Sequence, residues 1–327
     1  MAGNDTGIAF PAERTYSEWA ASDHQAVVFR DGIEAGGAGI EGVRLARGET
    51  CQGCHMPQPD NPTLPDDGYK ACFFGPDRTG NLPTHQFVGA NTWIPQILEG
   101  EFPKLQASTD GMFDNTVMWA QRMLSENSAR VETSASLAPG GETLNATVRV
   151  TNLAGHKLPT GYAEGRRMWL FVEVLDALDA PVWSNGAWDP ATGALSVDPQ
   201  TRIYEIKQGI WNSSTGECST TDAMGREKFH FVLNDCIAKD NRIPPLGFRG
   251  GQDAELRPYA ATYPETAPGS GRTVNFDVAS YAVPIPPGTS MPLSVRATLR
   301  FQISSREYIE FLRNQAVERS FPAENAL

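Results

Sequence analysis

The feature that most constrains this chain is Cys51-Gln52-Gly53-Cys54-His55, a Cys-x-x-Cys-His motif. This pattern is typical of covalent attachment of a c-type haem. Two thiols one helical turn apart can form thioethers with the two vinyl groups of a porphyrin. The adjacent His55 then lies under the iron as its proximal ligand. The motif therefore predicts one haem c held by Cys51, Cys54 and His55.

Cys-x-x-Cys also occurs in thioredoxin-like redox sites and in zinc sites, so two alternatives must be weighed. A thioredoxin-like motif follows a strand in a βαβ unit, and no such unit is visible in this sequence. A structural zinc site usually needs a second Cys-x-x-Cys or a His pair, and the sequence shows neither. Both alternatives are weaker than haem attachment.

The sixth iron ligand decides whether the iron is open to substrates. We favour His85, about thirty residues after His55, because its loop can fold back over a haem. His156, in a turn between two expected strands, is the second candidate, and His24, in a helix expected at residues 15–30, is the third. Methionine is a less favoured choice, with Met112, Met118 and Met123 available. A lone histidine at a helix end or in a turn otherwise serves a structural hydrogen bond.

The character of the chain changes near residue 130, which predicts two domains and an α+β fold. Residues 1–130 are expected to form a helical, loop-rich c-type haem domain, and residues 131–327 an antiparallel, immunoglobulin-like β-sandwich with a C-terminal helix. In the second part, Leu144, Ala146, Val148 and Val150 alternate with polar residues, as in a half-buried strand. Further strands are expected at 168–175, 202–207, 227–233, 273–278 and 293–303, and helices at 112–124 and 306–319.

Composition limits the possible partners and the cellular location. The net charge of −12 argues against nucleic acid as a partner and favours a basic protein surface. No apolar run is long enough for a membrane span. The first residues lack the basic and apolar regions of a signal peptide, so for an exported protein the signal peptide is expected to be absent from this chain. Cys218 and Cys236 can close a loop through a disulfide or remain buried thiols, with Cys72 left over.

With these motifs in view, the chain resembles the C-terminal portion of bacterial multihaem c-type cytochromes. The haem motif continues as Met56-Pro57, and His85, Phe87, Gly89 and Asn91 match a downstream His-x-Phe-x-Gly-x-Asn pattern whose histidine is a plausible distal ligand. The other matching segments are residues 16–22, 152–161, 164–170 and 239–245. Members of that family usually carry several Cys-x-x-Cys-His motifs, whereas this chain has one.

The resemblance implies an electron-transfer cytochrome with a six-coordinate, bis-histidine haem, exported to the periplasm or the cell exterior. A single haem implies that other c-type cytochromes or redox proteins complete the electron path, with this chain as an oligomer, a subunit of a multihaem complex or a fragment. Two alternatives stay open: a haem enzyme with an open distal site, of peroxidase or nitrogen-oxide reductase type, and a structural subunit of a multihaem assembly. We expect an electron carrier rather than an enzyme. Arg166 and Arg167 are candidates to pair with haem propionates, or else lie at an exposed strand edge.

Overall fold

The computed structural model describes residues 3–7, 13–25, 51–56, 69–70, 77–78, 85–229 and 231–319. It divides into two compact units, Met1–Ser22 with Ala129–Leu327, which we call the sheet unit, and Asp23–Ser128, which we call the helical unit. The break after Ser128 lies close to the expected boundary. The first 22 residues, however, group with the sheet unit, where the sequence had placed them in the first domain. Cys72 and His230 lie outside the described residues.

Each unit is described by itself. Helices and antiparallel sheets are both present, as expected of an α+β protein. In the sheet unit, one sheet has the strand order β11-β5-β4. Its strands are β4 (Ala129–Leu137), β5 (Thr143–Asn152) and β11 (Phe276–Pro284). On β5 the alternate residues Leu144, Ala146, Val148 and Val150 are buried, which confirms the predicted half-buried strand.

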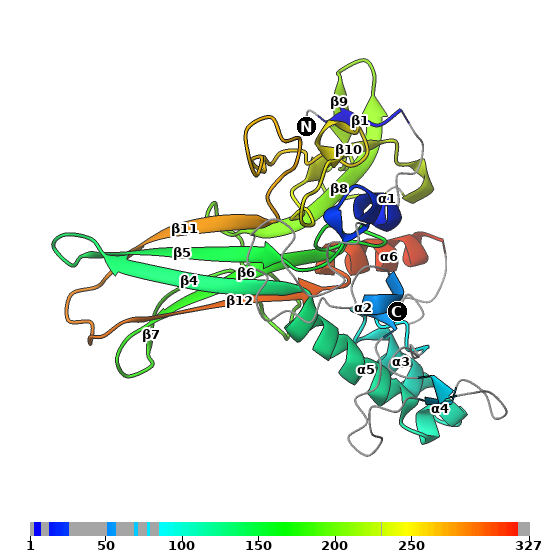
Figure 1. The fold of residues 1–327 in the computed structure, drawn as a ribbon, viewed down its shortest axis with the longest axis horizontal. Coiled ribbons are helices and arrows are strands. Elements are labelled where there is room, and N and C mark those ends of the chain that lie inside the picture. Colours follow the sequence, from blue (N-terminus) through cyan, green and yellow to red (C-terminus); the bar gives the residue numbers. More distant parts are fainter. Residues whose placement is uncertain are drawn as a thin grey trace. The chain divides into compact units, whose positions relative to one another are not determined.

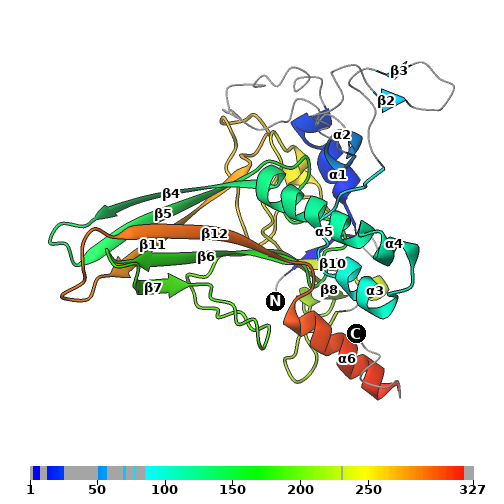
Figure 2. The same ribbon diagram turned by 90° about the horizontal axis from the view of Figure 1, so that it is seen from below.

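The other sheet of this unit has the order β1-β10-β8-β6-β12, with β7 beside β6 and β9 beside β8. The long strands β4, β5, β6, β11 and β12 run side by side (Figures 1 and 2). Pairing is antiparallel throughout, as in the register Leu170↔Leu299 between β6 and β12. The strands are β1 (Asn4–Asp5), β6 (Arg167–Leu175), β7 (Pro181–Asn185), β8 (Ile203–Asn212), β9 (Glu217–Ser219), β10 (Cys236–Asp240) and β12 (Ser294–Gln302).

Apolar side chains from both sheets form a common hydrophobic core. Val148 and Val150 on β5 and Leu170 and Val172 on β6 are fully buried in it, and Leu299 on β12 packs against it. Each fully buried aliphatic side chain contributes roughly 1.5–3 kcal/mol relative to exposure. This shared core holds the two sheets face to face.

The described residues of the segment expected to form a strand at 227–233, which are 227–229 and 231–233, do not form one, and that prediction was wrong. Residues Phe231–Leu233 form a 3-10 turn, η4, and Val232 and Leu233 are exposed. β8 pairs instead with β6 at residues 203–205, with β10 at 206–209 and with β9 at 210–212. The ring of Phe229 packs edge-on against Tyr308 and Phe311 instead.

Helices complete the sheet unit. The predicted C-terminal helix is confirmed as α6 (Arg306–Glu318), and the Ser305 side chain caps it by accepting a hydrogen bond from the Tyr308 backbone N–H at 3.2 Å. Gly165 has φ +73°, and a Cβ there would lie 2.6 Å from the Tyr308 side chain, so only glycine permits this close approach. The remaining helical elements are α1 (Thr15–Ala20) and η5 (Gly250–Gln252).

The helical unit contains the haem motif, on its own short helix. The helix predicted at 112–124 is confirmed as α5 (Met112–Arg122), with Val117 and Ala120 buried as its apolar face requires. The other elements are η1 (Asp23–Gln25), α2 (Cys51–His55), β2 (Tyr69–Lys70), β3 (Asp77–Arg78), α3 (Ile94–Glu101), α4 (Gln106–Thr109) and the π-helical turn η3 (Met123–Asn127). Across the described residues of both units, none of the helices is long and apolar enough to cross a bilayer.

Candidate functional site

The haem motif forms helix α2, which begins at Cys51 and ends at His55. Residues three apart on a helix share a face, so the two cysteines lie on the same side of α2. Cys51 is exposed and Cys54 is half-buried, and both are free of disulfides. Burial and, secondarily, the neighbouring Cys51 raise the pKa of the Cys54 thiol to about 11. A raised pKa favours the neutral thiol, whereas a thioredoxin-like nucleophile needs a stabilised thiolate.

His55 is held from two sides by the backbone of Val88. The Val88 N–H donates a hydrogen bond of 2.7 Å to the His55 carbonyl. The Nδ1 of His55 is in turn hydrogen-bonded to the Val88 carbonyl. Because a carbonyl can only accept, Nδ1 must carry the hydrogen, and Nε2 is then the nitrogen with the lone pair in the neutral ring. Ligating histidines are typically oriented by such a bond from the other ring nitrogen.

The residues around Val88 include His85, which is exposed. The His85 ring stacks on Phe87, with centroids 5.8 Å apart and an interplanar angle of 12°. Phe87 is itself 69% exposed and has φ +47°, in the left-handed region. At the other end, the Asn91 side chain accepts hydrogen bonds from the backbone N–H groups of Trp93 and Ile94 at 3.1 and 3.0 Å. These Asn91 contacts lie at the start of α3. Residues 85–91 therefore contact His55 through Val88 and then continue into α3.

The third histidine candidate, His24, lies in η1 and is buried. His24, His55 and His85 belong to the helical unit, whereas His156 belongs to the sheet unit. His156 lies in the loop after β5, with its Nδ1 3.0 Å from the Lys157 carbonyl, which again makes Nδ1 the donor. The Asn152 side-chain amide donates to the His156 carbonyl at 2.8 Å and to the Ile243 carbonyl at 2.9 Å. The backbone that carries His156 is therefore fixed from β5.

Four charged side chains that sequence reasoning did not single out meet in the interior of the sheet unit. We call Glu18, Lys157, Asp240 and Arg242 the buried charge cluster, since each is almost completely buried. Asp240 accepts from the Lys157 ammonium at 2.6 Å and from the Arg242 guanidinium at 2.9 and 2.8 Å. Arg242 also pairs with Glu18 at 2.9 Å. The Glu18 carboxylate accepts from the Lys157 backbone N–H at 3.1 Å and from the Thr160 hydroxyl at 2.7 Å.

The cluster explains why the first 22 residues belong to the sheet unit. Glu18 lies on α1, Lys157 follows β5, and Asp240 ends β10, so the cluster joins three segments that are far apart in the sequence. Two acidic and two basic groups balance in charge, and buried charges persist only when they are paired in this way.

Arg166 and Arg167 make different contacts within the sheet unit. Arg166 donates through Nη1 to the Thr160 carbonyl. Arg167 donates through Nε to the Gln302 side chain at 2.9 Å and pairs with Glu307 of α6 at 3.3 Å. Arg167 is thus buried and bound to two partners, contrary to the exposed strand edge considered from the sequence.

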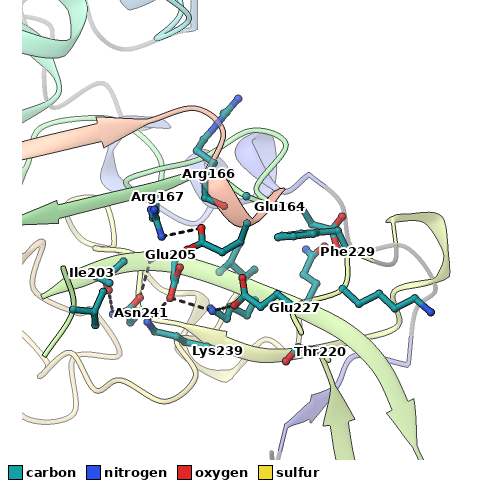
Figure 3. A pocket seen from close by; sticks show the side chains of 18 of the residues that line it. Glu164, Arg166, Arg167, Ile203, Glu205, Thr220, Glu227, Phe229, Lys239 and Asn241 are labelled. Atoms are coloured by element: carbon teal, nitrogen blue, oxygen red, sulfur yellow. Dashed lines mark hydrogen bonds and ion pairs between the residues drawn. The ribbon is translucent and has the colours of Figure 1, made fainter. Parts of the chain in front are cut away.

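Both arginines line a cleft of about 500 Å³ in the sheet unit. Figure 3 shows Arg166 directed away from the other labelled charges, while Glu205, Glu227 and Lys239 lie together on the floor of the cleft. Lys239 pairs with Glu205 at 2.8 Å, and Lys207 pairs with Glu227. These ion pairs link β8 to β10 and to residue 227, which is a structural role.

Comparisons with known proteins gave one structural likeness. No protein-family model matches the chain, and no curated protein matches it. Among solved structures, the chain is similar to a penta-haem cytochrome c552 from Thermochromatium tepidum, with 16% sequence identity and a TM-score of 0.40. The match covers 84% of this chain and 43% of that one, so this chain spans less than half the length of that protein.

Proposed function

We propose that this protein is an electron-transfer c-type cytochrome that carries one covalent haem on α2. The observation that carries the proposal is the state of the Cys-x-x-Cys-His helix itself. Cys51 and Cys54 are unpaired thiols on one helical face, and His55 has its Nδ1 hydrogen committed to the Val88 carbonyl. That donor set fits a porphyrin held by two thioethers, with Nε2 of His55 as the proximal ligand.

The residues of the chain would divide the work as follows. Cys51 and Cys54 would hold the porphyrin, and His55, oriented by the Val88 carbonyl, would ligate the iron. When bound, the haem supplies one-electron chemistry between its ferric and ferrous states. A second histidine would complete six-coordination and close the iron to substrates, and the candidates remain His85, His156 and His24. Arg166 and Arg167 remain candidates for pairing with propionates, in addition to the contacts that they make within the sheet unit.

Export to the periplasm or the cell exterior is part of the proposal. Cys218 on β9 and Cys236 on β10 form a disulfide, with a Cα–Cα distance of 5.9 Å, and both residues are completely buried. Disulfides form and persist in oxidising compartments. A lone haem also calls for an external donor and acceptor, so we propose other c-type cytochromes or redox proteins as partners.

The test is an absorption spectrum of the protein matured in an exporting host that attaches c-type haem. We expect one haem per chain that resists extraction, a low-spin reduced spectrum, and no change on adding carbon monoxide. The matched control is the double variant Cys51→Ala, Cys54→Ala, which should carry no covalent haem. A high-spin spectrum that shifts with carbon monoxide would replace the proposal with a haem enzyme, and a chain without haem would refute it.

A further inference from the structure

Residues 85–91 bear on which histidine can be the sixth ligand. Resting on the proposed function, we propose that this segment lies behind the proximal histidine, on the side away from the iron. Val88 would then be the positioning residue for His55, acting through its backbone carbonyl. His85 would not ligate the iron that His55 ligates.

The first step is the geometry of the imidazole ring. Nδ1 and Nε2 are separated in the ring by Cε1 and point outward in widely divergent directions, and the Nδ1 hydrogen of His55 is committed to the Val88 carbonyl. Iron must therefore approach from Nε2, with the ring standing between it and Val88. The second bond, from the Val88 N–H to the His55 carbonyl at 2.7 Å, fixes Val88 beside the end of α2.

The second step is the reach of the chain. A sixth ligand must approach the iron from the face of the porphyrin opposite His55. His85 precedes Val88 by only three positions. Even a fully extended chain of that length reaches at most about 11 Å from Val88. Residues 85 and 86 are in a turn, which shortens this reach further. The path from behind His55 must also pass around the edge of the porphyrin, and three residues in a turn do not provide that length.

The third step is the conformation of the segment. The His85 ring is stacked on Phe87, and the Asn91 side chain anchors the other end of the segment to the start of α3. Phe87 holds a left-handed φ of +47°, an unfavourable conformation for an aromatic residue that persists only where the surroundings impose it. The segment is therefore fixed at Val88 and Asn91, and a swing of His85 to the far face would break these contacts.

A consequence concerns the reduction potential. A hydrogen bond from Nδ1 to a carbonyl raises the basicity of the ligating nitrogen, which favours ferric iron and lowers the potential. Weakening the Val88 contact should therefore raise the midpoint potential without changing the spin state.

The deciding experiment compares wild type, His85→Ala and His85→Gln, each matured with haem. We expect all three to show the same low-spin reduced spectrum and to ignore carbon monoxide. A high-spin, carbon-monoxide-binding His85→Ala variant beside a low-spin wild type would overturn this inference and leave the proposed function standing. A wild type that is high-spin or without haem would instead refute the proposed function, so the two failures are distinguishable.

A second pair of variants tests Val88 directly. Val88→Pro removes the backbone N–H that fixes Val88 to His55, whereas Val88→Ala keeps both the N–H and the carbonyl. We expect an upward shift of the midpoint potential in Val88→Pro and none in Val88→Ala, with low-spin spectra in both. Equal potentials in the two variants would contradict the positioning role, and if Val88→Pro fails to mature, the His85 spectra still decide.

Discussion

Helix α2 and the buried charge cluster are two polar regions built in opposite ways. In the cluster, Lys157 and Arg242 find their carboxylates within the same unit, at 2.6 to 2.9 Å, with almost no exposure to solvent. On α2, Cys51 is exposed, and the Val88 carbonyl orients one nitrogen of His55. The charges of the cluster are all paired by groups of the chain itself, whereas α2 presents thiols and an imidazole nitrogen that suit a cofactor.

This difference separates structural polarity from functional polarity. A buried ion pair adds little stability compared with apolar packing, because desolvation offsets most of the attraction. Removing one partner is nevertheless costly, because it leaves the other charge buried without a counter-charge. The cluster therefore specifies which segments meet: α1, the loop after β5 and the end of β10. By contrast, α2 is only five residues long, and helices this short are not stable without external contacts. We expect α2 to depend on the proposed haem and the sheet unit to be independent of it.

Loss of the haem should produce the largest effect. In the double variant Cys51→Ala, Cys54→Ala, we expect faster amide hydrogen exchange in residues 51–56 and 85–101, because α2 loses the cofactor that it would hold and residues 85–101 are tied to α2 through Val88. Exchange in β5, β6 and β12 should match the wild type. Equal loss of protection in both units would show that the sheet unit also depends on the haem, and the contrast drawn here would fail.

The next largest effect should come from the cluster itself. Asp240→Ala leaves the Lys157 and Arg242 charges buried without their shared carboxylate, and we expect a loss of about 3–5 kcal/mol in the free energy of unfolding of the sheet unit. The measurement is urea denaturation followed by tryptophan fluorescence. The matched control is Arg296→Ala, which breaks the surface pair with Asp179, where the two side chains are 61% and 74% exposed. That control should cost about 0–1 kcal/mol. Similar losses in the two variants would contradict the role given to the cluster.

The sequence was most informative where local pattern decides structure. Alternation on β5 and helical spacing on α5 predicted both elements, because burial of one face follows directly from residue periodicity. The haem motif is likewise local, since its five residues lie within a single helix. The strand expected at 227–233 failed for the opposite reason, because a strand also needs a neighbouring strand to pair with, and β8 pairs with β6, β9 and β10 instead.

Long-range contacts were outside the reach of pattern reasoning. Glu18 looked like an ordinary residue of a polar first helix, and its partner Arg242 lies more than two hundred positions later. Nothing in the local sequence of α1 indicates that it docks on the sheet unit rather than on the domain that follows it. Val88 was also overlooked as a functional residue, because its role depends on a backbone carbonyl that any residue type can supply.

The smallest effect should appear on acidification and tests whether Asp240 is ionised in the folded protein. Burial alone would raise the pKa of Asp240, but the charges of Arg242 and Lys157 outweigh burial and lower the pKa below its ordinary value. A lowered pKa in the folded state means that this carboxylate stabilises the fold above the unfolded value of about 3.9. That stability is lost as pH falls from there through the folded pKa.

We therefore expect the difference in unfolding free energy between wild type and Asp240→Asn to be constant from pH 7 to about pH 5 and to shrink below about pH 4. Urea denaturation at each pH gives the difference directly. Asp179→Asn is the control, and its curve should run close to that of the wild type, because solvent screens the exposed pair with Arg296. A difference that stays constant down to pH 2 would mean that Asp240 does not titrate with folding in this range. A difference that grows in acid would mean that Asp240 is protonated in the fold, and the cluster would then be a set of hydrogen bonds around one uncompensated cation.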